Sequence, residues 1–192
     1  MKPVEADPVK LFFGVLYSDE TILNKAFELI EAWYGPIDFK SDSVPFEMTD
    51  YYVPEMGETI RRMFVSMEKL VSPKQIARTK LESNDIEESL SVEGKRKVNL
   101  DPGYLDYDKV VLASAKYNGD KVYLDFGIWA DLTLRYKNGT FESYPWSFPD
   151  FKAGLYHEVF KQIRETYKEQ RRILDAAKRE AASDIRLPKN RY

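Results

Sequence analysis

The sequence predicts an α+β fold: a ferredoxin-like βαββαβ first half, extended by a β-meander and closed by a long C-terminal helix. Residues 1–100 show the order strand, helix, strand, strand, helix, strand. Asn-Gly pairs at 118–119 and 138–139 separate short strand-like segments, which is typical of hairpins. From residue 151 onward, apolar residues recur with helical spacing. We therefore expect one domain over 1–192, composed of 1–100, the meander 101–150 and the C-terminal helix and tail 151–192.

The elements of the first half follow from apolar periodicity and from helix start and stop signals. Ser18 or Asp19 can cap the first helix, and Gly35 with Pro36 ends it. Pro45 favours an edge strand. The expected strands are 10–17, 37–46, 59–70 and 97–100, and the expected helices are 21–34 and 72–91.

The second half contains three further strands and a long helix. We expect residues 101–104 to form a turn, because Pro102 and Gly103 suit the two central positions of a type II turn. The expected strands are 109–117, 121–126 and 128–136, with a return at 141–144, and the expected helix is 153–185.

Composition limits the class of protein. The chain has 192 residues, of which 43% are hydrophobic and 14% aromatic, which is enough for a packed core. It has no cysteine, so disulfides, thiol nucleophiles and cysteine metal sites are excluded. The first eight residues are not an apolar leader, and no apolar run approaches the roughly 18 residues that span a membrane. We therefore expect a cytoplasmic protein without membrane partners.

Charge is distributed unevenly along the chain. The net charge is −3, but residues 150–192 hold 11 lysines and arginines against 7 acidic residues. An acidic body with a basic tail argues against a general nucleic-acid-binding protein, whose main surface is basic. The basic helix could instead contact the acidic body of a second subunit, which makes a homodimer the alternative partner.

Several common active sites are excluded by the motifs that are missing. There is no phosphate-binding loop ending in Gly-Lys-Ser/Thr and no Gly-x-Gly-x-x-Gly. The single histidine, His157, falls in the last expected helix and has no histidine partner for a metal site. Acid–base chemistry must therefore rest on carboxylates, lysines or tyrosines, and the sequence identifies no cofactor.

The turn that follows residue 100 is the strongest candidate site. Asp101 could act as a ligand or general base, Asn99 adds an amide, and Tyr104 offers a hydroxyl or a stacking surface. The alternative is equally open: the aspartate of a Pro-Gly turn can simply accept hydrogen bonds from its own backbone.

Two other segments add polar and aromatic groups. The loop 49–57 contains Tyr51, Tyr52 and Glu55, a composition found where loops line ligand pockets, although such tyrosines can also only cover a core. On strand 128–136, regular alternation places Trp129, Asp131 and Arg135 on one face. That face is either a cross-strand surface ladder or the floor of a cleft.

Strings along most of the chain resemble a bacterial and archaeal family that is known only as a domain of unknown function. The resemblance rests on segments 46–57, 98–104, 110–114 and 145–146. Some members are labelled GTP-binding proteins, but this sequence lacks the phosphate loop that would explain the label. The family pattern often has a His-Arg pair where this chain has Asp120 and Lys121, so a histidine mechanism is not implied here.

The sequence therefore predicts a pocket for an anionic or nucleotide-like small molecule. No metal site is assigned, and a divalent metal held by the carboxylates of Asp101, Glu55 and Asp131 stays open as an alternative. If it is an enzyme, Asp101 or Glu55 would be the base, and Lys116 or Arg135 would stabilise charge. The expected ligand-binding residues are Tyr51, Tyr52, Asn99, Tyr104, Lys116, Trp129, Asp131 and Arg135. The alternative function is a binding or scaffold module that uses an open sheet face and the basic helix to bind RNA or a second subunit.

Overall fold

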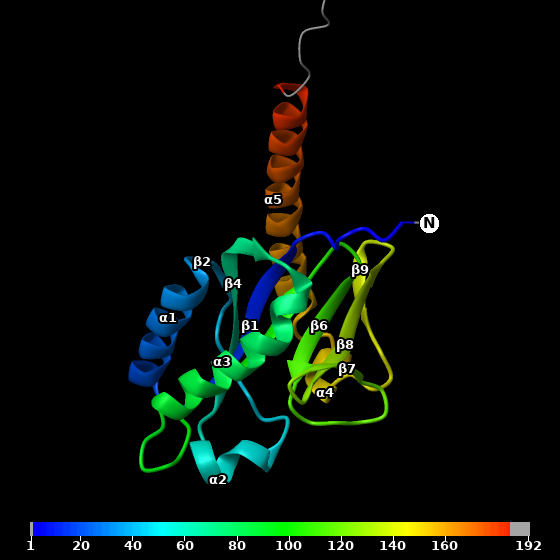
Figure 1. The fold of residues 1–192 in the computed structure, drawn as a ribbon. Coiled ribbons are helices and arrows are strands. Elements are labelled where there is room, and N and C mark those ends of the chain that lie inside the picture. Colours follow the sequence, from blue (N-terminus) through cyan, green and yellow to red (C-terminus); the bar gives the residue numbers. More distant parts are fainter. Residues whose placement is uncertain (1, 185–192) are drawn as a thin grey trace, which may run out of the picture.

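The computed structural model describes residues 2–184 and has an α+β fold, as predicted (Figure 1). Nine antiparallel strands form one open sheet, in the order β2-β4-β1-β5-β6-β8-β7, with β3 beside β4 and β9 beside β8. The strands are β1 (Val9–Tyr17), β2 (Ile37–Lys40), β3 (Val44–Pro45), β4 (Arg61–Val71), β5 (Val98–Leu105), β6 (Lys109–Ser114), β7 (Val122–Asp125), β8 (Ile128–Lys137) and β9 (Thr140–Ser143). The helices are α1 (Glu20–Tyr34), α2 (Val53–Met56), α3 (Ile76–Ser89), α4 (Pro149–Lys152) and α5 (His157–Asp184).

The sequence located most elements of the first half. The side chain of Asp19 caps α1 by accepting a hydrogen bond from the Ile22 N–H, and Gly35 ends the helix at φ 89°. Segment 49–57, expected to be a loop, instead forms a short 3₁₀ turn and α2. The last residue of the predicted C-terminal helix, Ile185, lies outside the described residues.

Helices cover both faces of the sheet. Figure 1 shows α1 and α3 on the near side, whereas α5 begins behind the sheet and extends beyond its upper edge. One core lies under α1 and α3, and a second, rich in aromatic rings, packs α4 and α5 against the opposite face. In Figure 1 no helix of the described residues lies in front of β8 and β9, so the open sheet face of the scaffold alternative is covered only in part.

The predicted turn at 101–104 is wrong, because Pro102 and Gly103 lie inside β5, paired with Phe13 and Phe12 of β1. The backbone N–H and C=O of Leu100 face away from β1, toward the side of β6. Backbone groups alternate along a strand, so the backbone of Pro102 also faces that side. Pairing between β5 and β6 begins only at Gly103, so the missing N–H of Pro102 leaves no ladder hydrogen bond unmade.

The predicted meander is also wrong, because β6 pairs with β8 and β7 lies outside β8. Asn118 and Gly119 therefore connect strands that are not neighbours. The hairpin turn lies at Phe126 and Gly127, with φ 55° and 76°, whereas the predicted hairpin at 138–139 is confirmed.

A bulge in β8 changes which residues share a face. Val110 and Val111 pair with Leu134 and Leu132, so Thr133 is left over. Asp131 therefore lies on the α5 side of the sheet and Arg135 on the other, contrary to the regular alternation that the sequence suggested.

Candidate functional site

The sheet forks between β5 and β6. These strands pair only through residues 103–105 and 110–112, and the parts beyond separate. A cleft of about 1040 Å³ occupies the fork. It is lined by α3 from one face of the sheet, α4 from the other, and the segment 46–52 at the mouth.

Side chains of α3 take the place of a neighbouring strand at the open edge of β5. Glu87 accepts a hydrogen bond from the Leu100 N–H at 2.7 Å, and Lys80 donates to the Leu100 carbonyl at 2.8 Å. Both side chains are buried. Seven residues apart, they lie on one face of α3, but charged residues on a helix face are usually solvated, so the sequence alone does not indicate this role.

Asp101 lies at the inner end of the cleft among polar partners. Its Oδ2 accepts a hydrogen bond from the Asn99 amide at 3.0 Å, and Lys80 Nζ lies 3.5 Å from its Oδ1. The guanidinium of Arg62 approaches to 3.7 Å, and Arg62 also lies 3.4 Å from Asp150 of α4. Arg62 and Asp150 were not predicted, because contacts across 88 residues leave no local signal.

Arg96 fixes the mouth of the cleft. Its guanidinium makes two hydrogen bonds to Glu55, at 2.6 and 2.8 Å, and one to Glu87 at 2.6 Å. Hydrogen bonding from Arg96 lowers the pKa of Glu55, whereas burial raises the pKa of Glu87. Glu55 is therefore committed to holding α2 in place.

The opposite wall contains a buried ion pair. Asp131 Oδ2 lies 3.4 Å from Lys121 Nζ, while Asp131 Oδ1 is buried with no hydrogen-bond partner. Burial raises the pKa of Asp131. Lys121 also donates to Ser114 at 2.8 Å, so it links the end of β6 to β8.

Aromatic side chains border the cleft mouth. The ammonium of Lys116 lies 3.8 Å from the centre of the Tyr51 ring, and its hydrogen bond lowers the pKa of Tyr51. Burial raises the pKa of neighbouring Tyr52 to about 12. Phe148 and Tyr117 are exposed on the other side of the mouth.

Six of the ten predicted site residues line this one cleft; they are Tyr51, Tyr52, Asn99, Asp101, Lys116 and Asp131. Glu55 does not line the cleft but binds Arg96, which does. Trp129 also lies outside the lining and packs against the lining residue Tyr117, with ring centres 4.8 Å apart.

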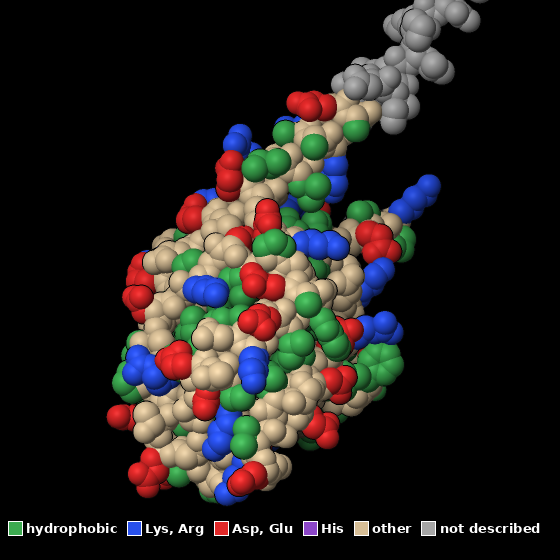
Figure 2. Space-filling model, turned by 90° about the vertical axis from the view of Figure 1, so that its left-hand side faces the viewer, with side chains coloured by type: hydrophobic (Ala, Val, Ile, Leu, Met, Phe, Trp, Pro, Cys, Tyr) green, Lys and Arg blue, Asp and Glu red, His purple; other side chains and the backbone are tan. Residues whose placement is uncertain are grey.

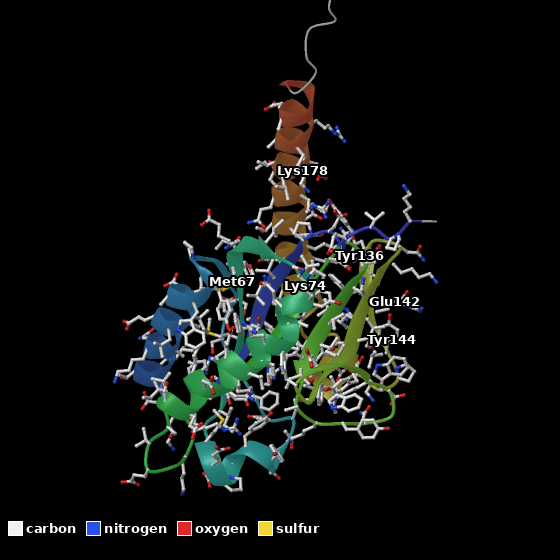
Figure 3. All side chains as sticks on the ribbon, in the orientation of Figure 1. Met67, Lys74, Tyr136, Glu142, Tyr144 and Lys178 are labelled. Carbon is white, nitrogen blue, oxygen red and sulfur yellow. The ribbon has the colours of Figure 1, made fainter. Side chains whose placement is uncertain are left out.

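Two predicted residues lie elsewhere. Tyr104 points to the face that carries α1 and α3, because its β1 partner is Leu11, and it borders a separate hollow of about 300 Å³. Arg135 is exposed and pairs with Glu142 at 2.7 Å. Figure 3 labels Glu142 beside β8 and β9, far from α2. The β8 bulge and the distance along the strand both exclude Arg135 from the cleft.

The described residues show no metal-holding group of three or more histidine or carboxylate side chains, so Asp101, Glu55 and Asp131 do not gather around an ion. Within residues 2–184, no helix is both long and apolar enough to cross a membrane. On the face seen in Figure 2, basic and acidic side chains are interspersed instead of forming one basic patch.

Comparisons with known proteins identify a family and no function. A search of curated proteins returned no match, and neither did a search of solved structures. A family model, described as "Domain of unknown function (DUF4416)", matches residues 7–167. This match covers the whole sheet, the cleft and the first part of α5, so the chain belongs to that family of unknown function.

Proposed function

We propose that the cleft between β5 and β6 binds a small molecule with an anionic group, of nucleotide-like size and shape. The observation that carries the proposal is the concentration of charged groups in this one cleft, including Asp131 and Arg62, each with a buried atom that lacks a hydrogen-bond partner. Buried polar atoms in native proteins nearly always have partners. These two side chains therefore have hydrogen-bonding capacity that the protein itself does not use.

Lys116 is the best candidate to receive the anionic group. It is exposed, it lies at the mouth, its ammonium rests on an aromatic ring, and no carboxylate among residues 2–184 forms an ion pair with it. The rings of Tyr51 and Phe148 could cover a planar group. If the protein is an enzyme, we favour Asp101 over Glu55 as the base, because both oxygens of Glu55 are bonded to Arg96.

We also infer that residues 1–100 form a ferredoxin-like unit within one domain. The antiparallel order β2-β4-β1-β5, with α1 and α3 on one face, supports this assignment. A cytoplasmic location stays a prediction.

The test of ligand binding is a thermal-shift series on the wild type and on Asp101→Ala, with AMP, ATP, inorganic phosphate and pyrophosphate. At least one probe should raise the melting temperature of the wild type by several degrees, and less in the variant. A shift below about one degree for every probe would remove this proposal.

A second candidate is self-association through β7, an edge strand whose four residues are all exposed, among them Val122 and Tyr123. Exposed apolar edges can pair with another strand. Sedimentation of the wild type, of Val122→Lys and of a chain truncated after Gln170 separates an edge-strand dimer from a helix-mediated one.

Salt-dependent binding of a single-stranded RNA would favour the nucleic-acid alternative instead.

A further inference from the structure

Arg62 is buried beside the cleft with most of its hydrogen-bond donors unused. A guanidinium has five N–H groups, and its charge-assisted hydrogen bonds are normally about 2.7–2.9 Å long. Arg62 makes one long bond, from Nη1 to Asp150 at 3.4 Å, and its guanidinium also interacts with the Tyr156 hydroxyl, which donates to the same carboxylate. Its Nη2 lies 3.7 Å from Asp101 Oδ2, and its Nε has no partner.

The position of this guanidinium is well defined. The rings of Phe46 and Tyr156 lie 5.0 and 5.7 Å from its central carbon. Asp150 is fixed in turn, because it accepts hydrogen bonds from the Tyr156 hydroxyl and the Phe151 N–H, both at 3.0 Å. The unused donors of Arg62 are therefore held in one orientation.

Asp101 presents unused acceptors next to these donors. A carboxylate has about four lone-pair sites, and this one makes a 3.0 Å bond to Asn99 and a long 3.5 Å contact with Lys80. Its side chain is 29% exposed, the highest exposure among the carboxylates paired with Arg62 and Lys80. A donor and an acceptor thus stand side by side at the inner end of the cleft.

Local charge decides what this pair can bind. Arg62 contacts two carboxylates, Asp101 and Asp150, while Lys80 is shared between Asp101 and Glu87. This end of the cleft therefore has no excess positive charge to hold an anion. A fully cationic group would in turn meet two buried cations.

We propose that Arg62 and Asp101 form a subsite for a neutral group that presents an acceptor beside a donor, which is the pattern of a carboxamide or of the amide edge of a nucleobase. The carbonyl oxygen would accept from Arg62, and the N–H would donate to Asp101. This inference rests on the proposed function and adds an orientation: the amide edge lies inside and the anionic group at Lys116.

Three probes with the same ring and different head groups test the subsite. Benzamide presents an acceptor and a donor, benzoate presents only acceptors, and benzamidine presents only donors and a positive charge. NMR titration of the wild type should show benzamide binding at least about tenfold more tightly than either analogue, because a site built for a hydrogen-bonding group rejects analogues that lack it.

The variants Arg62→Gln and Asp101→Ala should each abolish the preference for benzamide. Arg62→Lys, which keeps the charge but not the planar fork, should also weaken it, and it guards against a folding defect in the glutamine variant. Arg61→Gln is the matched control, because Arg61 bonds to Ser43 and does not line the cleft.

The outcomes separate the two proposals. Equal binding of the three probes, or an undiminished preference in Arg62→Gln, would overturn the subsite. If AMP still shifts the melting temperature of the wild type in that case, the cleft remains a ligand site with a different inner chemistry. If neither AMP nor any ring probe binds, both proposals fail.

Discussion

The carboxylate of Glu87 accepts the backbone N–H of Leu100 at 2.7 Å, so a helix side chain occupies the place of a neighbouring strand. Lys80 completes the substitution at the carbonyl of the same residue. The open edge of β5 is therefore satisfied without β6, and the sheet can fork at this point. The cleft exists because α3 takes over this hydrogen bonding.

Replacing Glu87 with alanine should destabilise the protein by about 2–4 kcal/mol, because the buried N–H of Leu100 and the guanidinium of Arg96 both lose a partner. Glu87→Gln keeps an acceptor and should lose less than half as much. Urea denaturation of both variants measures the difference, and equal losses would contradict the role assigned to the N–H bond.

Gly103→Ala should destabilise the fold by about 2–3 kcal/mol or more. A methyl group there would lie 2.5 Å from the Phe12 ring and 2.7 Å from the carbonyl oxygen of Val111, and backbone cannot move aside cheaply. Gly119→Ala is the control, since its added methyl group meets nothing within 4 Å. Similar denaturation midpoints for both variants would refute this account of β5.

Arg96→Gln should release α2 and the aromatic segment before it. We expect a loss of about 2–3 kcal/mol in the free energy of unfolding, because Glu87 stays buried without its 2.6 Å partner. We also expect faster hydrogen exchange in residues 51–57, because Glu55 loses both hydrogen bonds to Arg96. Arg135→Gln breaks an exposed pair with Glu142 and should cost less than about 1 kcal/mol. Unchanged exchange in Arg96→Gln would show that α2 is held by packing alone.

Asp131 should make stability depend on pH. Burial raises the pKa of this carboxyl, so the folded state binds its proton more tightly than the unfolded state does. The stabilisation from this group is complete below about pH 4 and is lost as the pH rises through the raised pKa. The free energy of unfolding of the wild type, measured relative to Asp131→Asn, should therefore fall over that range. A rising difference would mean that Lys121 outweighs burial.

Local patterns were enough to predict most elements of the first half, although the strand expected over 37–46 is two short strands and the loop expected over 49–57 contains α2. The apolar run of β1 and the cap at Asp19 act within a few residues, so they can be identified without tertiary information. The hairpin at Asn138 and Gly139 is confirmed for the same reason, because both residues adopt the positive φ that this turn needs.

The errors arose where long-range pairing overrode a local signal. Pro102 and Gly103 predict a turn when they are considered alone. In the structure, Pro102 lies in β5 where no neighbouring strand needs its N–H, and Gly103 lacks a side chain that would collide with Phe12. In the same way, Asn118 and Gly119 predict a hairpin between β6 and β7, but β6 pairs with β8 instead. No local pattern reports such partners.

The candidate site was only partly predictable. Asn99 and Asp101 were identified because they lie beside Pro102 and Gly103, which predict a turn; the turn is wrong, but both side chains line the cleft. Arg62 was not, since an arginine in an alternating strand looks like a solvent-facing residue until Asp150 is placed beside it. The bulge at Thr133, which removes Arg135 from the cleft, has no clear sequence signature.

The central claim is that the fork between β5 and β6 is a ligand site, and an NMR titration of the ¹⁵N-labelled protein with AMP tests it most directly. The account predicts saturable shifts concentrated in amides that line the cleft, at Asn99, Asp101 and residues 113–117, and their loss in Asp101→Ala. No saturable shift, or shifts centred on the hollow beside Tyr104 and Arg171, would contradict it.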